Sequence, residues 1–89
     1  MENSASPFGL KVQWYLEGQD GVGVVIGTMS YDKNVWCVAT EETIGMPLHR
    51  EYCRFGNQYD TEMARELRRR YTDQYGTHHF NETDLVNVA

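Results

Sequence analysis

The feature that most constrains this chain is a series of three segments in which bulky apolar residues alternate with other residues. In residues 10–16 every second residue is large and apolar. That period of two is typical of a half-buried strand. Residues 22–31 and 35–40 predict two further strands, and the turn-forming residues at 18–21 and 32–34 predict short connections between them. Three strands joined by short turns indicate an antiparallel meander.

The clearest helix is predicted over residues 60–75. Asp60 suits the N-cap, because its carboxylate can accept hydrogen bonds from backbone N–H groups of the first turn. Leu67 and Tyr71, spaced by four, belong to an apolar stripe that would lie against the sheet. Gly76 suits the C-terminal cap.

Residues 47–55 fit two structures. As a helix, they have Pro47 in the first turn and Gly56 just after the end, which is the usual asymmetry of helix termini. As a strand, their alternation is broken by Arg50 and Arg54, which fall on the apolar face. We therefore expect a short second helix here, with a strand as the alternative.

The whole chain of 89 residues is expected to form one α+β domain. We predict a three- to four-stranded antiparallel β-meander packed against the C-terminal helix at about 60–75, with residues 1–8 and 77–89 partly flexible. A domain of this size buries only about 60–65% of its unfolded surface. Little structure then remains from which to build a deep catalytic cleft.

The net charge of −5 disfavours binding to nucleic acid in general and to anionic membranes. No run approaches the roughly 18 apolar residues of a membrane span, and residues 1–8 lack the features of a signal peptide. We therefore expect a cytoplasmic protein without a membrane partner. Cys37 and Cys53 would then be reduced.

The positive charge is concentrated in residues 50–70, which carry six arginines against four acids. Four of these arginines lie along the predicted helix, namely Arg65, Arg68, Arg69 and Arg70. They could form a solvated face with pairs such as Glu66 and Arg70, contact an acidic surface of a partner protein, or grip nucleic-acid phosphate. The net acidity makes nucleic acid the less favoured partner.

No cofactor or metal site is predicted. The glycines at 21, 23 and 27 are spaced one residue too widely for a dinucleotide fingerprint and lie in a predicted strand. We expect Gly21 to serve the turn, and Gly23 and Gly27 to make room for an aromatic ring or a bulge. A structural zinc site needs closely paired ligands, whereas the two cysteines are 16 residues apart.

The best catalytic pair is Cys53 with His49, one helical turn earlier if residues 47–55 are helical. The neighbouring Arg54 could lower the pKa of the thiol. No motif supplies an orienting group or an oxyanion site, so we expect the protein not to be an enzyme.

Aromatic residues make up 12% of the chain. One helix covers one face of a three-stranded sheet, so Tyr15, Tyr31 and Trp36 would be partly exposed on the other face. An aromatic patch of that kind marks a partner-binding surface or a dimer interface. In the alternative arrangement, residues 47–55 and the tail cover this face.

No family motif can be matched residue by residue. The favoured function is that of a small acidic protein-binding domain, an inhibitor or regulator of a larger protein or complex, including one that handles nucleic acid. In size, acidity and aromatic content the chain resembles phage-encoded inhibitors of host defence or host enzymes, including anti-CRISPR proteins. If it is phage-encoded, it is expected in the cytoplasm of the host cell.

Seven residues are predicted to contact the partner, namely Tyr15, Tyr31, Trp36, Arg65, Arg68, Arg69 and Arg70. The first alternative is a small nucleic-acid-binding protein that uses the Arg-rich helix at 65–70, and the second is a small Cys/His enzyme. A homodimer formed through an exposed strand edge is compatible with each of these functions.

Overall fold

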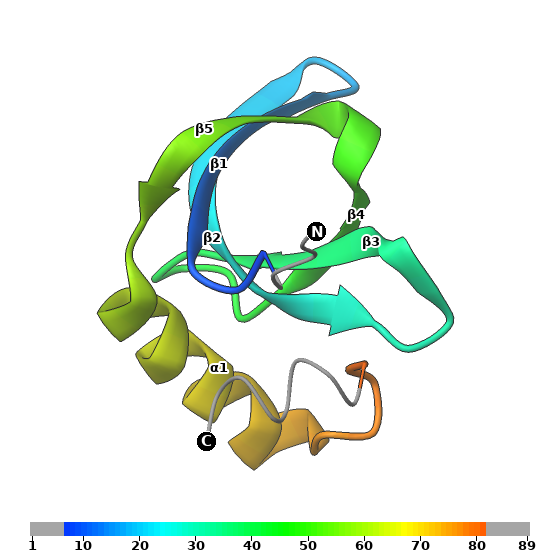
Figure 1. The fold of residues 1–89 in the computed structure, drawn as a ribbon, viewed down its shortest axis with the longest axis vertical. Coiled ribbons are helices and arrows are strands. Elements are labelled where there is room, and N and C mark those ends of the chain that lie inside the picture. The colour runs from blue at the N-terminus through cyan, green and yellow to red at the C-terminus, as the bar shows by residue number, and fades with distance from the viewer. Residues whose placement is uncertain (1–6, 82–89) are drawn as a thin grey trace.

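The computed structural model of the protein describes residues 7–81. The elements, in chain order, are β1 (Leu10–Leu16), β2 (Gln19–Met29), β3 (Asp32–Ala39), β4 (Met46–His49), the one-turn 3-10 helix η1 (Arg50–Tyr52), β5 (Cys53–Tyr59) and α1 (Thr61–Tyr75). All strand pairs are antiparallel, and the order across the sheet is β4-β3-β2-β1-β5. The predicted α+β class is confirmed, with five strands in place of three to four (Figure 1).

The predicted meander is confirmed, but both of its turns come earlier than the sequence indicates. Glu17 and Gly18 form a two-residue turn with φ values of 52° and 81°, the backbone conformation that matches the twist of a hairpin. β2 therefore already begins at Gln19, and the expectation that Gly21 serves the turn is wrong. The second turn precedes Asp32, which pairs with Met29.

The second helix predicted over residues 47–55 is wrong. Its first part is β4, where Leu48 pairs with Trp36 of β3. Its last part is β5, where Cys53 pairs with Trp14 of β1. Between the two strands, η1 makes a single turn. This turn interrupts the period of two, which is why the sequence alternation fails in the middle of the segment.

The inner face of the sheet is closed by the sheet itself. The strands curl into a small barrel-like ring (Figure 1). Its interior is filled from all five strands, by Leu10, Val12, Val25, Trp36, Val38, Leu48 and Cys53. Of the two arrangements left open by the sequence, the one in which residues 47–55 and the tail cover the second face is correct for residues 47–55. It is wrong for the described part of the tail, because Phe80 packs in the other cluster, beside α1. Trp36 is only 4% exposed, and the expectation that it lies open to solvent is wrong.

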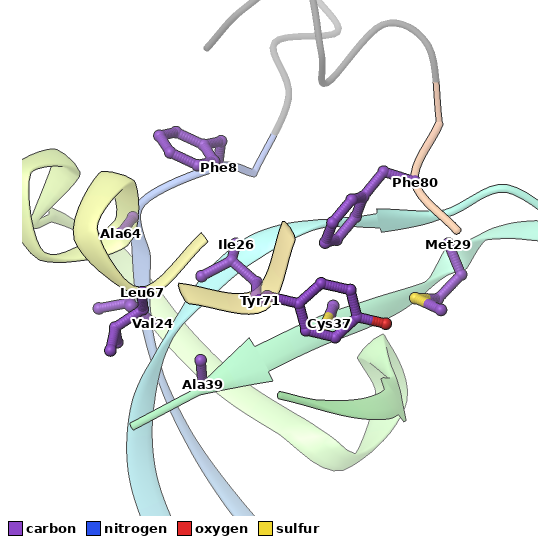
Figure 2. Packing of buried hydrophobic residues seen from close by; sticks show 10 residues of the cluster. All are labelled: Phe8, Val24, Ile26, Met29, Cys37, Ala39, Ala64, Leu67, Tyr71 and Phe80. Carbon is purple, nitrogen blue, oxygen red and sulfur yellow. The ribbon is translucent and has the colours of Figure 1, made fainter. Parts of the chain in front are cut away.

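The outer face of β2 and β3 is covered by α1. The helix contributes Ala64, Leu67 and Tyr71 to a second cluster, with Phe8 and Phe80 at its margins (Figure 2). The sheet contributes Val24, Ile26, Met29, Cys37 and Ala39. Since both faces of β2 are buried over this stretch, its sequence is almost continuously apolar rather than alternating.

The helix α1 begins and ends as predicted. The carboxylate of Asp60 accepts a hydrogen bond from the backbone N–H of Met63 at 3.0 Å, and Gly76 caps the other end with φ 82°. Beyond the helix, Phe80 is buried and forms an isolated bridge with Met29. The flexibility predicted for the two chain ends falls mainly on residues 1–6 and 82–89, which lie outside the described residues.

Candidate functional site

Arg68 is part of the core rather than of the surface. Its side chain is 3% exposed. The Nη1 group donates a hydrogen bond to the carbonyl oxygen of Ile26 at 3.1 Å, and the guanidinium lies 4.1 Å from the centre of the Phe80 ring. This side chain therefore joins α1 to β2, and the expectation that it lies on a solvent-facing stripe is wrong.

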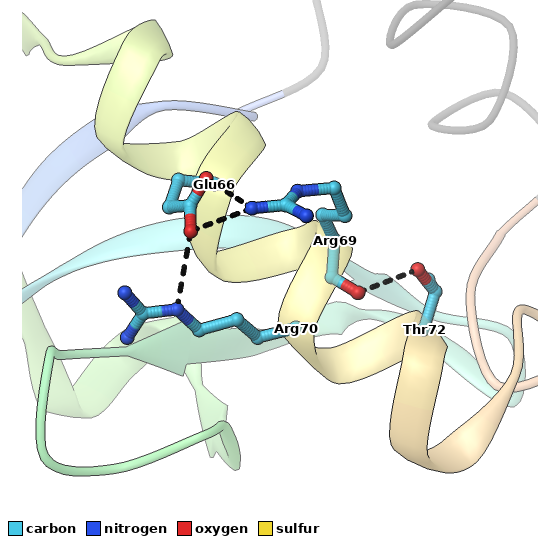
Figure 3. Close-up of polar contacts among 4 residues, drawn as sticks. All are labelled: Glu66, Arg69, Arg70 and Thr72. Carbon is cyan, nitrogen blue, oxygen red and sulfur yellow. Dashed lines mark hydrogen bonds and ion pairs between the residues drawn. The ribbon is translucent and has the colours of Figure 1, made fainter.

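The neighbouring arginines form an exposed network on α1 (Figure 3). Arg69 Nη2 donates to both carboxylate oxygens of Glu66, at 2.7 and 2.8 Å, and Arg70 Nε donates to Glu66 at 3.3 Å. The hydrogen bond from Arg69 is the main reason that the pKa of Glu66 is lowered. The predicted pairing of Glu66 with Arg70 is confirmed. Arg65 is exposed, so three of the four predicted arginines lie on the surface and two of them share one carboxylate.

Cys53 and His49 do not form a nucleophile–base pair. The ring Nδ1 of His49 accepts a hydrogen bond from the backbone N–H of Glu51 at 3.2 Å. The Cys53 thiol instead donates to the backbone carbonyl of His49 at 3.8 Å, and burial raises the pKa of this thiol. A raised pKa disfavours the thiolate, which is the nucleophilic form.

Metal and cofactor sites find no support in the arrangement of residues 7–81. Within that range no three His, Cys, Asp or Glu side chains are grouped so that they could hold a metal ion. Both cysteines are free. Gly27 makes room for an aromatic ring, as predicted, because a methyl group at this position would come within 2.6 Å of the Phe80 ring.

Most exposed large apolar side chains belong to three neighbouring strands and to η1. Eight such side chains occur in the described part of the chain, and six of them belong to β1, β2, η1 and β5. These six are Tyr15, Leu16, Val22, Tyr52, Phe55 and Tyr59. The strand register divides them between the two faces of the sheet, since Phe55 lies opposite the interior residue Val12 and contacts the Trp36 ring. Tyr15 and Val22 lie on the outer face, where they are opposite Asp20 and Gln13. We call the outer face of these three neighbouring strands the β2–β1–β5 side.

Tyr15 and Tyr31, which the sequence assigns to one aromatic surface, are both exposed but lie far apart. Tyr15 lies opposite Asp20, close to the β1–β2 turn, whereas Tyr31 follows the other end of β2. That strand has 11 residues, so roughly 30 Å of extended chain separates the two ends. Only Tyr15 belongs to the β2–β1–β5 side.

A hollow of about 440 Å³ lies on this side, where β1 ends and where β2 and β5 begin. Its size is within the range of ligand pockets. It is lined by Gln13, Trp14, Tyr15, Asp20, Glu51, Tyr52 and Arg54. The side chain of Trp14 packs against the interior cluster, so the two tyrosines supply the aromatic rings of the hollow.

The strand register brings these residues together. Asp20 of β2 lies opposite Tyr15 of β1, and Arg54 of β5 lies opposite Gln13 of β1. Residues directly opposite each other in antiparallel strands have their side chains on the same face. η1 immediately precedes β5 and supplies Tyr52 and the remaining acid. The hollow therefore combines three separate stretches of the sequence.

Trp14 is held in place by a glycine on the neighbouring strand. Gly21 lies opposite Trp14, and a methyl group at position 21 would come within 2.7 Å of the indole Cε2 atom. Real carbon atoms do not approach so closely. The indole therefore packs directly on the backbone of β2, on the interior side of the sheet behind the hollow.

Sequence reasoning identified only Tyr15 among the residues of this hollow. The sequence places Tyr52 and Arg54 in an ambiguous segment and Asp20 in a turn. The signal that could have revealed the hollow is the weakness of the helical pattern over residues 47–55. A strand that begins at Cys53 would have placed η1 beside β1.

Comparison with known proteins gives no family. No protein-family model matches the chain, and no match is found among curated proteins or among solved structures. Within residues 7–81, no helix is long and apolar enough to cross a membrane. Fold and surface together define a small antiparallel barrel with one packed helix and an aromatic, charged hollow.

Proposed function

We propose that the protein is a protein-binding domain that contacts its partner through the β2–β1–β5 side, centred on the hollow. The observation that carries this proposal is that Tyr15 and Tyr52, which are 66% and 48% exposed, line one hollow together. Exposed apolar surface around a hollow is typical of interaction sites on soluble domains. The tyrosines are well suited to it, since they bring large contact area and few rotatable bonds.

The finer part of the proposal is that binding inhibits or regulates a larger protein or complex. It is supported by the small size and net charge of −5 and by the resemblance in general character to phage-encoded anti-defence proteins. Action in the cytoplasm of a host cell belongs to this part of the proposal. A protein partner is favoured over nucleic acid, because Arg68 is buried and Arg69 and Arg70 are engaged by Glu66.

The test is an affinity capture with matched pairs of tyrosine variants. The site variant is Tyr15→Ser/Tyr52→Ser, whose side chains are 66% and 48% exposed. The control is Tyr31→Ser/Tyr75→Ser, whose side chains are 69% and 46% exposed but lie outside the β2–β1–β5 side. Both variants are expected to remain folded by circular dichroism, since all four side chains are on the surface.

The tagged proteins are incubated with host lysate, with and without nuclease treatment, and bound proteins are identified by mass spectrometry at low and high salt. We expect one stoichiometric partner with the wild type and the control, and its loss with the site variant. Equal capture by all three proteins would show that the partner uses another surface. Capture that disappears after nuclease treatment or at high salt would favour nucleic acid.

A further inference from the structure

The charged side chains of the hollow are not neutralised by one another. Within the described residues, Asp20 and Arg54 form no ion pair, and the carboxylate of Glu51 has only His49 Nδ1 near it, at 3.8 Å. The two carboxylates and one guanidinium give the lining a formal charge of −1. The same surface therefore offers negative charge next to the exposed rings of Tyr15 and Tyr52.

The geometry of the sheet separates Asp20 from Arg54. Asp20 lies on β2 and Arg54 on β5, and β1 runs between these strands. Tyr15 lies directly opposite Asp20, so one flank of the hollow pairs an aromatic ring with a carboxylate. A cation on this flank would gain both a contact with the ring face and a charge-assisted hydrogen bond.

We propose that the hollow binds a basic side chain, arginine or lysine, that the partner protein inserts beside Tyr15 and Asp20. This inference rests on the proposed function and specifies the chemistry of the partner's anchor residue. It agrees with the net charge of −5 of the whole chain, which favours encounter with a basic surface. An anchor of this type in an aromatic pocket is a common source of interface energy.

Arg54 determines the orientation of the partner segment that carries the basic side chain. Its guanidinium repels a cation on the β5 flank and attracts a carboxylate or a backbone carbonyl there. The basic side chain is therefore directed to the β2 flank, while the adjoining backbone of the partner lies near Arg54. Removal of the positive charge at this position is expected to strengthen, rather than weaken, the binding of an isolated cationic group.

The test uses N-acetylarginine amide as the probe and N-acetylcitrulline amide as the neutral analogue of similar shape. Each is titrated into isotope-labelled protein, and the indole N–H of Trp14 and the backbone amides are followed by NMR. We expect shift changes confined to the hollow, with the arginine probe binding at least about fivefold tighter, a ratio typical of a partly desolvated cation–aromatic contact. Equal binding of the two probes would overturn the inference.

Two variants make the charge dependence specific. Asp20→Asn/Glu51→Gln is expected to weaken binding of the arginine probe about tenfold, whereas Arg54→Gln is expected to tighten it severalfold. The matched control is Glu62→Gln/Asp73→Asn, which removes two exposed carboxylates from α1. An equal loss in the control would show that only the overall charge matters and would contradict a specific site.

The captured partner distinguishes the two proposals. If Tyr15→Ser/Tyr52→Ser loses the partner but Asp20→Asn/Glu51→Gln retains it with unchanged affinity, the protein-binding surface stands and the basic anchor is wrong. If the probe binds as expected but the partner is unaffected by the tyrosine variant, the cation site stands and the proposed interface is wrong. Loss of the partner in both variants supports both proposals.

Discussion

Arg68→Ala is expected to destabilise the domain strongly, although the sequence places Arg68 in a row of arginines that look equivalent. The substitution removes a hydrogen bond from a charged donor to the Ile26 carbonyl, worth about 1.5–3 kcal/mol. It also removes a buried contact between the guanidinium and the Phe80 ring, worth about 2 kcal/mol. Part of this loss is offset, because the guanidinium no longer has to be desolvated.

The net loss in the free energy of unfolding is then about 2–4 kcal/mol, which for a domain of this size lowers the Tm by roughly 10–25 °C. The matched control is Arg69→Ala on the same helix. Its side chain is exposed and bonded only to an exposed carboxylate, so the Tm should change by only a few degrees.

Both variants are compared with the wild type by thermal and urea unfolding, followed by circular dichroism. If Arg68→Ala melted within a few degrees of Arg69→Ala, the role assigned to the buried guanidinium would be wrong. For the same reason, neither Trp36→Ala nor the replacement of Arg68, Arg69 and Arg70 by Glu is a valid test of partner binding. Such variants alter the core, and loss of a buried Trp alone costs about 3–5 kcal/mol.

Three further outcomes follow from local geometry. Gly21→Ala should displace the Trp14 indole, visible as altered tryptophan fluorescence and a lowered Tm, and an unchanged spectrum would contradict the packing. Burial raises the pKa of Cys37 to about 12, so this thiol should resist alkylation at pH 8 until the protein unfolds, as read by mass spectrometry. The pKa of Glu66 is lowered below its ordinary 4.5, chiefly by the hydrogen bond from Arg69. Its stabilising contribution is therefore present above pH 4.5 and lost as the pH falls through the lowered value. The Tm difference between wild type and Glu66→Gln should accordingly shrink as the pH falls through this lowered pKa, and a constant difference would contradict this.

The elements that the sequence predicts well are those determined by local patterns. The helix at 60–75 has a capping carboxylate at Asp60, an apolar stripe and a terminal glycine, and these signals lie within one or two turns of the residues they affect. The first strand has an uninterrupted period of two. The bounds of both elements in the structure agree with the predicted bounds to within one residue.

The segment 47–55 could not be predicted because its structure depends on distant partners. Leu48 is in a strand because Trp36 lies beside it, and Cys53 is in a strand because Trp14 lies beside it. The single turn of η1 between the two strands interrupts the alternating pattern of the segment. Pro47 is compatible with this arrangement because β4 is an edge strand.

The arginines show the same limit for side-chain environment. Arg65, Arg68, Arg69 and Arg70 share one short stretch of sequence, and helical spacing alone cannot tell which one meets a ring from beyond the helix. That distinction depends on Phe80, which returns to β2 after the helix has ended. The hollow was missed for a related reason, since it combines the β1–β2 hairpin with η1, and that proximity exists only once β5 pairs with β1.

The position of the candidate site follows from how far α1 extends over the sheet. Val24 of β2 is 2% exposed beneath the helix, whereas Val22, on the same face two residues earlier, is 62% exposed. The strand thus passes from core to surface over one pleat and reaches the hollow at Asp20, next to a two-residue turn. A binding surface built on such a tightly paired hairpin needs little ordering when a partner arrives, and preorganisation of this kind lowers the entropic cost of association. The hollow is therefore held in shape by the paired backbones of β1, β2 and β5, while the residues that select the ligand are side chains with no role in the core. This separation is what allows the charge variants at Asp20, Glu51 and Arg54 to report on recognition without disturbing the fold.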